Sequence, residues 1–271
     1  MAHWAPEDIP WDAFDPAYLD PEILKLVKTA AMVEKNAADY ATYLCNVFPE
    51  DEAFQKATRY WAEEEIQHGD VLGRWAEMAD PDFNFLARFE IFRQGYRIPV
   101  DRVSSLRGSQ SGELVARCVV EMGTSSYYSA LGDAVNEPTL KAICTHIADD
   151  EFRHYKLFYS YLQRYQESER LSCWAKVKVV LGRVSESEDD ELSYAYYAAN
   201  NQGEPYERWA NAAAYEGAAI GYYNSGAVRR GVAMTLDAIG LKSDGWLACA
   251  LSSLAWRVMG WRRRRLLHAA A

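Results

Sequence analysis

The chain has 271 residues, of which 49% are hydrophobic and 25% charged, with 16 glycines and 9 prolines. This composition is typical of a globular protein and excludes collagen-like, disulfide-scaffold and mostly disordered chains. The formal net charge is −10. Because an acidic surface of this size repels phosphate backbones, we expect no nucleic-acid partner.

The charge is unevenly distributed along the chain. Residues 241–271 hold six basic residues against one acidic residue, a net charge of +5, which leaves −15 on residues 1–240. The C-terminal segment therefore differs in character from the rest of the chain.

Cysteine spacing and the amino terminus indicate the compartment. The five cysteines show no Cys-x-x-Cys spacing, so we expect free thiols in a reducing environment. Residues 1–15 contain four acidic residues and no apolar stretch of the kind found in a signal peptide. The apolar window 246–261 is shorter than the roughly 20 residues that span a bilayer. These features predict a cytoplasmic protein.

Helical periodicity dominates the chain. Apolar residues recur at three- and four-residue intervals, and alternating β-branched runs are nearly absent, so the chain is predicted to be all-α. The connections between the first four long helices are short, long and short, which is typical of a four-helix bundle with one long crossover. In chain order we expect helices over 21–48, 51–79, 84–94, 111–135, 138–166, 171–184, 189–200, 204–224, 226–239 and 244–268.

One arrangement of acidic residues and histidines occurs twice within the expected bundle. A single Glu on one helix is followed by Glu-x-x-His on the next helix, with gaps of 31 and 30 residues from the single Glu to the pair. Positions i and i+3 share a helix face, so the Glu and His of each pair can point at the same place. This is the ligand set of ferritin-like di-iron or di-manganese carboxylate proteins. The candidate metal ligands are Glu34, Glu65, His68, Glu121, Glu151 and His154.

These residue types suit iron. Carboxylate oxygens stabilise both Fe(II) and Fe(III), two of them can bridge the metals, and one imidazole per metal leaves positions open for dioxygen. Zinc would prefer fewer carboxylates, and calcium would prefer no histidine. The alternative, that the pairs are ordinary solvated helix residues, conflicts with their matched order on four helices. We therefore expect two iron ions, with a manganese–iron pair as a variant.

Neighbouring residues complete the predicted centre. Glu64 and Asp150 immediately precede the acids of the two Glu-x-x-His pairs, and each is placed to accept the ring N–H of the opposite histidine. The alternative is that both are exposed helix acids. Small residues near Glu34 and Glu121 leave room for a substrate cavity or, equally, for close helix packing. Thr124 is a candidate catalytic residue that assists oxygen activation, unless its hydroxyl bonds a backbone carbonyl.

Four segments resemble the soluble acyl-carrier-protein desaturases, a ferritin-like di-iron family. The stretch Glu64–Asp70 is similar to the family's E-E-x-R-H-G-D, and Asp150–His154 is similar to its D-E-x-R-H. Glu121–Thr124 matches E-x-x-T, and Trp4–Asp8 resembles W-x-P-x-D. In the first motif, Gln67 stands in place of the family's arginine.

The resemblance covers roughly residues 1–166, so we expect these to form the metal-binding bundle with its N-terminal segment. Residues 167–271 match no desaturase helix and are expected to form a helical extension packed on the bundle in the same domain. The resemblance implies that Trp4 lies beside Asp150 and His68 in a path for electron transfer. Without the resemblance, Trp4 would be an apolar anchor of the terminus.

The leading hypothesis is a dioxygen-dependent oxidoreductase that uses two irons to remove hydrogen from an unactivated C–H bond. The resemblance implies a fatty acyl chain on an acyl carrier protein as substrate, a ferredoxin-type electron donor and a homodimer. No dinucleotide- or flavin-binding fingerprint accompanies the site. One alternative is hydroxylation, N-oxygenation or deformylation of a smaller molecule at the same metals. The other is an iron- or peroxide-handling ferritin-like protein.

The C-terminal segment combines tryptophans and leucines with a basic cluster. We expect a basic amphipathic helix that docks an acidic acyl carrier protein or makes peripheral contact with an anionic membrane. The alternative is that the helix packs on the bundle and leaves its arginines solvated. The candidate surface residues are Arg257, Arg262, Arg263, Arg264 and Arg265.

Overall fold

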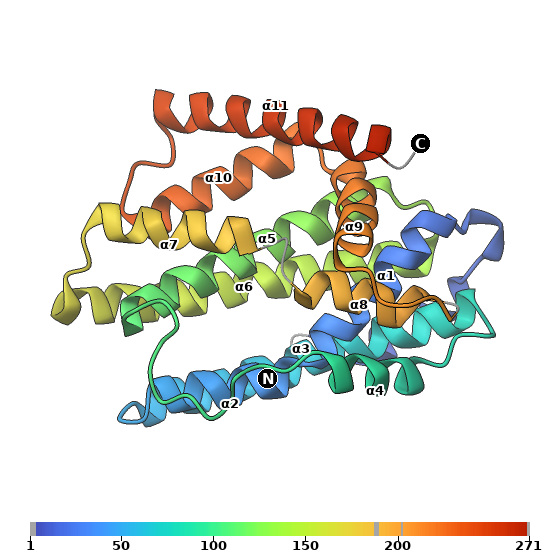
Figure 1. Cartoon of the computed structure of the whole chain (residues 1–271), viewed down its shortest axis with the longest axis horizontal. Helices are drawn as coiled ribbons and strands as arrows, with labels where there is room; N and C mark the ends of the chain where they lie inside the picture. The colour runs from blue at the N-terminus through green and yellow to red at the C-terminus, as the bar shows by residue number, and fades with distance from the viewer. Residues whose placement is uncertain (1–3, 187–189, 202, 270–271) are drawn as a thin grey trace.

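The computed structural model describes residues 4–186, 190–201 and 203–269, and these form helices and connections without a strand (Figure 1). The prediction of an all-α protein is confirmed. Three short 3-10 turns, η1 (Pro6–Asp8), η2 (Trp11–Ala13) and η3 (Pro16–Tyr18), precede the helices. The helices are α1 (Pro21–Lys35), α2 (Ala37–Val47), α3 (Glu52–Ala79), α4 (Phe85–Gly95), α5 (Gln110–Ala134), α6 (Pro138–Glu169), α7 (Cys173–Glu186), α8 (Asp190–Asn200), α9 (Arg208–Tyr222), α10 (Ser225–Ile239) and α11 (Trp246–Ala269).

The prediction of one continuous helix over 21–48 was wrong. The backbone leaves the helical conformation at Asn36, with φ −82° and ψ 4°, and the helix is divided there into α1 and α2. The division comes directly after a close contact between α1 and α3. A Cβ on Gly69 of α3 would lie only 2.6 Å from the backbone nitrogen of Lys35. The absence of a side chain at Gly69 therefore permits the contact that brings Glu34 against α3.

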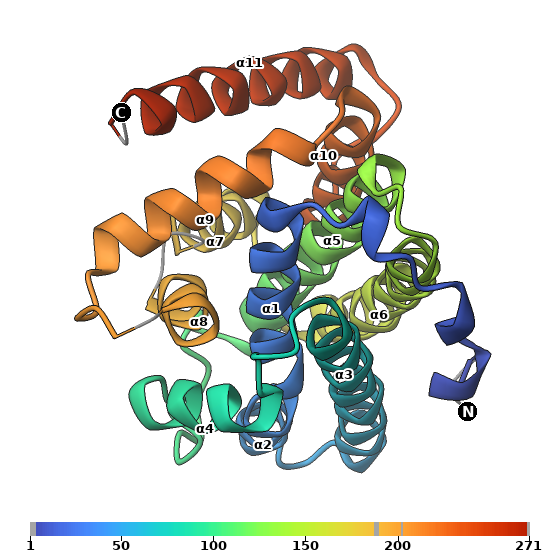
Figure 2. The ribbon, with the colours of Figure 1, turned by 90° about the vertical axis from the view of Figure 1, so that its right-hand side faces the viewer.

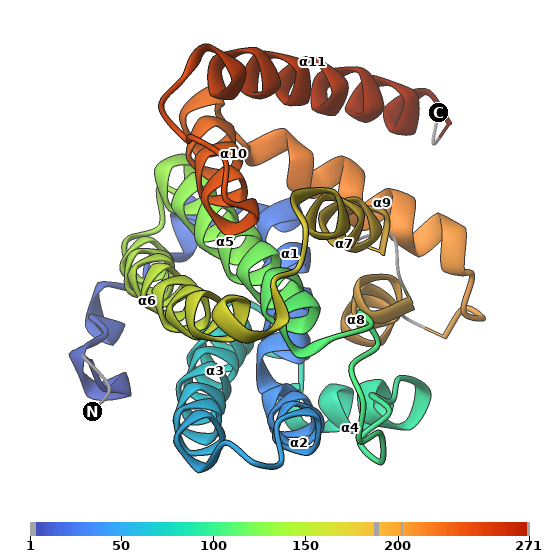
Figure 3. The ribbon, with the colours of Figure 1, turned by 90° about the vertical axis from the view of Figure 1, so that its left-hand side faces the viewer.

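Four helical rods surround a common interior. Helix α1 packs along α3, α5 packs along α6, and α3 also contacts α6. Figures 2 and 3 show α3 and α6 strongly foreshortened, with α1 and α5 beside them. The crossover expected between the second and third long helices is present and carries α4, close to the helix expected over 84–94.

The C-terminal helices form a second layer on the bundle. Helix α8 packs on α1 and α4, while α7 and α10 pack on α5. Ala195, Ala198 and Ala199 of α8 belong to the same buried apolar cluster as Leu26 and Leu72 of the bundle. The two layers therefore share one core.

Helix α11 lies on α9 and α10, at the edge of the molecule farthest from α4 (Figure 1). None of the described helices combines the length and apolar character needed to traverse a lipid bilayer. The described residues do not include position 189, where a helix was expected to start. They also leave out residues 1–3 and 270–271, at the outer ends of the two predicted segments.

The five cysteines are free thiols. Cys118 and Cys144 are buried in the bundle, whereas Cys173 and Cys249 are exposed on α7 and α11.

Candidate metal centre

The six predicted ligands meet in the interior of the bundle. All are buried, with at most 6% of any residue exposed. They come from α1, α3, α5 and α6 and form two groups, in each of which the donor atoms lie within 4.8 Å of one another. One group is Glu34, Glu65, His68 and Glu151, and the other is Glu65, Glu121, Glu151 and His154.

Two carboxylates belong to both groups. Glu65 on α3 and Glu151 on α6 are shared, whereas each group has one histidine and one further glutamate of its own. Carboxylates can bridge two metal ions, and imidazole binds one. The arrangement therefore matches two adjacent metal positions joined by Glu65 and Glu151.

Buried donor atoms without hydrogen bonds face this centre. The Nδ1 atoms of His68 and His154 and one Oε1 atom each of Glu65 and Glu151 have no hydrogen-bond partner. They nevertheless lie close together: His154 Nδ1 is 2.8 Å from Glu65 Oε1, and His68 Nδ1 is 3.4 Å from Glu151 Oε1. Buried polar groups normally have partners. The unpartnered atoms and the mixed carboxylate–imidazole donor set fit a pair of transition-metal ions.

The outward-facing nitrogen of each histidine is held by an acid from the opposite helix. His68 Nε2 on α3 is 3.1 Å from Asp150 Oδ2 on α6, and His154 Nε2 on α6 is 2.9 Å from Glu64 Oε2 on α3. Both acids are buried, so the alternative that they are exposed helix acids was wrong. A carboxylate at Nε2 favours a proton there, so that Nδ1 would be the nitrogen available to hold a metal.

Arg153 joins the two outer acids, a role that the sequence analysis missed. Its guanidinium contacts both Glu64 and Asp150. Burial by itself would raise the pKa of Asp150, but hydrogen bonds from His68 and Arg153 outweigh it and lower this pKa to about 2. Gln67, at the corresponding position of the first motif, donates instead to the backbone carbonyl of Trp4 over 3.3 Å.

Trp4 lies at the outer edge of the centre, where the sequence analysis expected it. Its indole Nε1 donates to Asp150 Oδ2 over 2.8 Å. The ring is stacked parallel to His68, with centroids 6.0 Å apart, and also against His146. Asp150 thus joins Trp4 to a histidine of the centre.

A buried tyrosine holds the ligand on α1. Tyr128 on α5 donates its hydroxyl to Glu34 Oε1 over 2.5 Å. The sequence analysis did not identify Tyr128, although it lies two helical turns after Glu121 and so shares its helix face. That spacing was the available signal.

A buried arginine accompanies the ligand on α5, also unforeseen from the sequence. Arg117 forms an ion pair with Glu121 one turn away, and its guanidinium carbon lies 4.5 Å from the ring centroid of Trp61. Burial raises the pKa of Glu121 to about 8, although the charge of Arg117 opposes this shift. An arginine in an otherwise apolar helical window, four residues before a candidate ligand, was the signal for its role.

The pKa values of Glu65 and His68 are raised as well. Burial, followed by the charges of Glu151 and Glu34, raises the pKa of Glu65 well above its usual range. Burial lowers the pKa of His68, but Asp150 and Glu151 raise it more, to about 9. In the metal-free protein the centre is therefore rich in protons near neutral pH.

Thr124 contacts the centre through a ligand. Its Oγ1 donates to Glu151 Oε2 over 2.6 Å and lies 3.1 Å from the carbonyl oxygen of Glu121. The hydroxyl therefore lies beside a candidate ligand and also within reach of a backbone carbonyl, and its role in oxygen activation stays a prediction. Of the small residues near Glu34, Ala30 and Ala31 are buried, whereas Ala38 is exposed.

The five candidate surface arginines lie on α11, outside the metal centre, and do not act as one group. Arg262 forms an ion pair with Glu216 of α9. The guanidinium of Arg263 lies where a Cβ on Gly221 of α9 would approach within 2.9 Å. The expectation that all five face a partner was therefore wrong for Arg262, which is bound to α9, while Arg257, Arg264 and Arg265 are exposed.

No family model matches this chain, and a search of curated proteins finds none that matches it significantly. The geometry of the centre is the basis of the function proposed next.

Proposed function

We propose that this chain is a ferritin-like di-iron protein. The single observation that carries the proposal is the sharing of Glu65 and Glu151 by two buried donor groups, each with its own histidine and terminal glutamate. Such a donor set has two carboxylates to bridge a metal pair and one imidazole for each metal. A manganese–iron pair would use the same donors.

The energetics of the buried cluster support metal binding over a purely structural role. Burying ionisable groups without a compensating charge is strongly unfavourable. In the metal-free protein the four carboxylates are compensated by Arg117 and by protons held on buried groups such as His68 and Glu121, whereas two divalent cations would balance them directly. A tetrahedral zinc site would use fewer oxygens, and a calcium site would not use His68 and His154.

The surrounding side chains have definable tasks. Glu64 and Asp150 hold the histidines so that Nδ1 faces the interior, Tyr128 fixes Glu34, and Arg117 fixes Glu121. A bound iron pair supplies the capacity to activate dioxygen for oxidation of a substrate C–H bond.

Thr124 contributes a proton beside this centre. Its hydroxyl is held 2.6 Å from Glu151 Oε2, between α5 and α6. Rotation of the hydroxyl proton would let Thr124 donate toward the interior instead, which suits the proposed assistance in oxygen activation.

We propose an oxidoreductase that desaturates a fatty acyl chain presented by an acyl carrier protein. A ferredoxin-type donor would supply the electrons that reduce the metal centre. The likeness of the Glu-Glu-x-x-His and Asp-Glu-x-x-His segments to the desaturases supports this choice. The contacts that join Trp4, Asp150 and His68 support entry of electrons at this edge. Hydroxylation of a smaller molecule is the second candidate, because the same donors serve both reactions.

Product analysis tests the proposal. Iron-loaded protein is reduced and exposed to dioxygen with a panel of saturated acyl-carrier substrates and small amines, aldehydes and alkanes. Mass spectrometry then distinguishes the loss of two hydrogens from the gain of an oxygen atom. We expect an alkene from one acyl substrate and none from Glu151→Ala, while Glu63→Ala, an exposed neighbour of the centre, retains activity. Iron uptake without any organic product would instead indicate an iron-handling protein and contradict the proposal.

A further inference from the structure

Helix α11 is the outermost element on its side of the molecule. Figures 1, 2 and 3 all show it beyond α9 and α10, with its full length along one edge and with α4 on the opposite side. A helix of 24 residues is about 36 Å long. It therefore presents a protruding ridge with no element of the described chain above it.

One face of this ridge combines apolar anchors and positive charges. Trp246, Leu254 and Trp261 are 82%, 57% and 51% exposed, respectively. Together with Ala250, Arg257 and Arg264 they recur at intervals of three or four residues, so they lie on one side of the helix. All six are exposed, and we call them the outer face of α11. The buried Ala248 lies on the opposite side, against the α10 residues Leu236 and Ile239.

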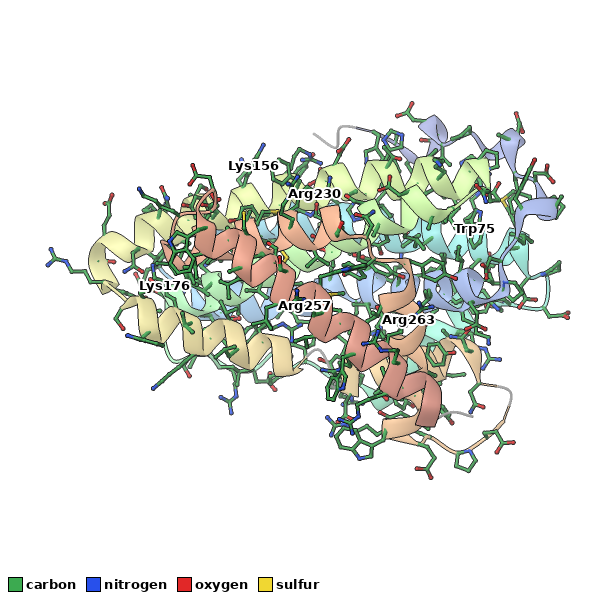
Figure 4. All side chains as sticks on the ribbon, turned by 90° about the horizontal axis from the view of Figure 1, so that it is seen from above. Trp75, Lys156, Lys176, Arg230, Arg257 and Arg263 are labelled. Carbon is green, nitrogen blue, oxygen red and sulfur yellow. The ribbon has the colours of Figure 1, made fainter. Side chains whose placement is uncertain are left out.

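The charged residues of α11 itself are all basic. No acidic residue follows Asp244 in the sequence. Arg265 extends the outer face, with its guanidinium carbon 4.8 Å from the ring centroid of Trp261. Figure 4, which looks down on this side, labels Arg257 and Arg263 on α11 and Arg230 on the neighbouring α10. Residues 1–240 carry a net charge of −15, so an anionic surface that attracts α11 repels the rest of the chain.

We propose that the outer face of α11 lies on the surface of an anionic phospholipid membrane, with the helix parallel to the bilayer plane. Tryptophan is favoured at the boundary between headgroups and acyl chains, where its ring is buried and its N–H stays hydrated. Arginines between such anchors extend their guanidinium groups to lipid phosphates. Repulsion of the acidic body fixes the orientation with α11 toward the lipid.

Two other occupants fit the outer face less well. A symmetric contact between two copies of α11 would bring arginines of like charge together. A partner groove that receives a helix is lined mainly by apolar side chains, whereas the outer face of α11 places Arg257 and Arg264 among its apolar anchors. A planar anionic surface meets the anchors and the charges along the whole helix.

Vesicle flotation with the full-length chain tests the proposal. We expect the protein to float with phosphatidylcholine vesicles that contain about one third phosphatidylglycerol, and to lose this binding as salt is raised. Binding to vesicles of phosphatidylcholine alone should be at least about tenfold weaker. Failure to bind the anionic vesicles would overturn the proposal, and so would equal binding to both compositions.

Matched variants locate the contact. Removing the anchors by Trp246→Ser, Leu254→Ser and Trp261→Ser, or reversing charge by Arg257→Glu, Arg264→Glu and Arg265→Glu, should each weaken binding at least about tenfold. The first control removes the same residue types elsewhere on the surface, by Trp174→Ser, Leu181→Ser and Trp209→Ser. The second makes the same charge change on and after α4, by Arg93→Glu, Arg97→Glu and Arg102→Glu. All of these control positions are exposed.

Both control triples should bind vesicles within about twofold of the unaltered chain, and circular dichroism verifies that every variant is folded. Equal loss in the control and α11 variants would overturn the proposal. So would a dimer in sedimentation that dissociates only in the α11 variants, or binding of an acidic acyl carrier protein in place of vesicles. Because the vesicles are tested without substrate or iron, the result is independent of the proposed di-iron chemistry.

Discussion

His154 on α6 and Glu64 on α3 face each other across the bundle, with the histidine Nε2 2.9 Å from the glutamate Oε2. The next residue of α3, Glu65, approaches the other nitrogen of the same ring, at 2.8 Å from Nδ1. The outer acid Glu64 thus orients the His154 imidazole so that its other nitrogen faces the inner acid Glu65. The pair His68 and Asp150 repeats the arrangement in the opposite direction.

We predict that Glu64→Gln and Asp150→Asn each weaken iron binding by about 10- to 100-fold. The amide cannot accept the ring proton as a carboxylate does, so the histidine loses its fixed orientation. Competition with a chromogenic ferrous chelator measures the change. The exposed neighbours provide controls, because Glu63→Gln and Asp149→Asn leave the inner contacts intact. Equal affinities in all four variants would refute the positioning role.

We predict that Glu65→Gln stabilises the metal-free protein and destabilises the iron-loaded protein. Burial and neighbouring carboxylates raise the pKa of Glu65 in the folded state. A carboxyl with a raised pKa must take up a proton on folding, so it lowers stability above its unfolded pKa and has no such effect at lower pH. The gain on substitution should be roughly 1–3 kcal/mol near pH 7 and should vanish near pH 4. Urea unfolding at both pH values, with and without iron, provides the measurement, and a loss of stability in the metal-free variant would contradict it.

We predict that Arg117→Leu destabilises the metal-free fold by about 3 kcal/mol at about pH 9, above the pKa of about 8 at which Glu121 ionises, because the ionised carboxylate is then buried without its ion-pair partner. The double variant Arg117→Leu with Glu121→Gln should recover most of that loss, since no isolated charge remains. Arg59→Leu, at an exposed position of α3, should change stability by less than about 0.5 kcal/mol. Additive losses in the double variant would show that Arg117 acts through packing alone.

We predict that iron loading releases protons. In the metal-free protein the pKa of Glu121 is about 8 and that of His68 is about 9, so both carry a proton that a metal ion must displace near neutral pH. With the other buried donors, loading should release on the order of two to four protons per chain, and affinity should rise with pH up to about pH 9, where His68 loses its proton. Titration in weakly buffered indicator solution counts the protons. Iron uptake without acidification would mean that the metals bind elsewhere.

The meeting of the six candidate ligands was predictable because it depends on spacing within single helices. Glu65 and His68 share a face by helical geometry alone, and so do Glu151 and His154. The outer acids were equally predictable, because each adjoins a ligand in the sequence.

Contacts that depend on the rotation of one helix against another were not predictable. The bond from Tyr128 to Glu34 joins residues 94 positions apart, and the sharing of Arg153 by Glu64 and Asp150 depends on the crossing of α3 and α6. The division of the first helix at Asn36 was likewise not predictable, because Asn36 lies beside a close contact between Lys35 and Gly69 of another helix, which no local pattern reveals.

The position of the C-terminal helix was the least predictable feature. Periodicity indicated a helix and its charge indicated a basic face, but the sequence did not show which arginines turn inward. Arg262 is held by Glu216, 46 residues earlier, on a helix that packs beside α11 only in the folded chain. Because that contact holds Arg262 against α9, Arg262 does not belong to the outer face of α11.

Anaerobic ferrous titration of the full-length, chelator-stripped chain tests the central claim most directly. We predict two tightly bound irons per chain, about one in Glu34→Ala, which removes a ligand of one group, and fewer than one in Glu65→Ala, which removes a shared ligand. Binding of no iron by the unaltered chain, or of the same amount by all three proteins, would contradict the account.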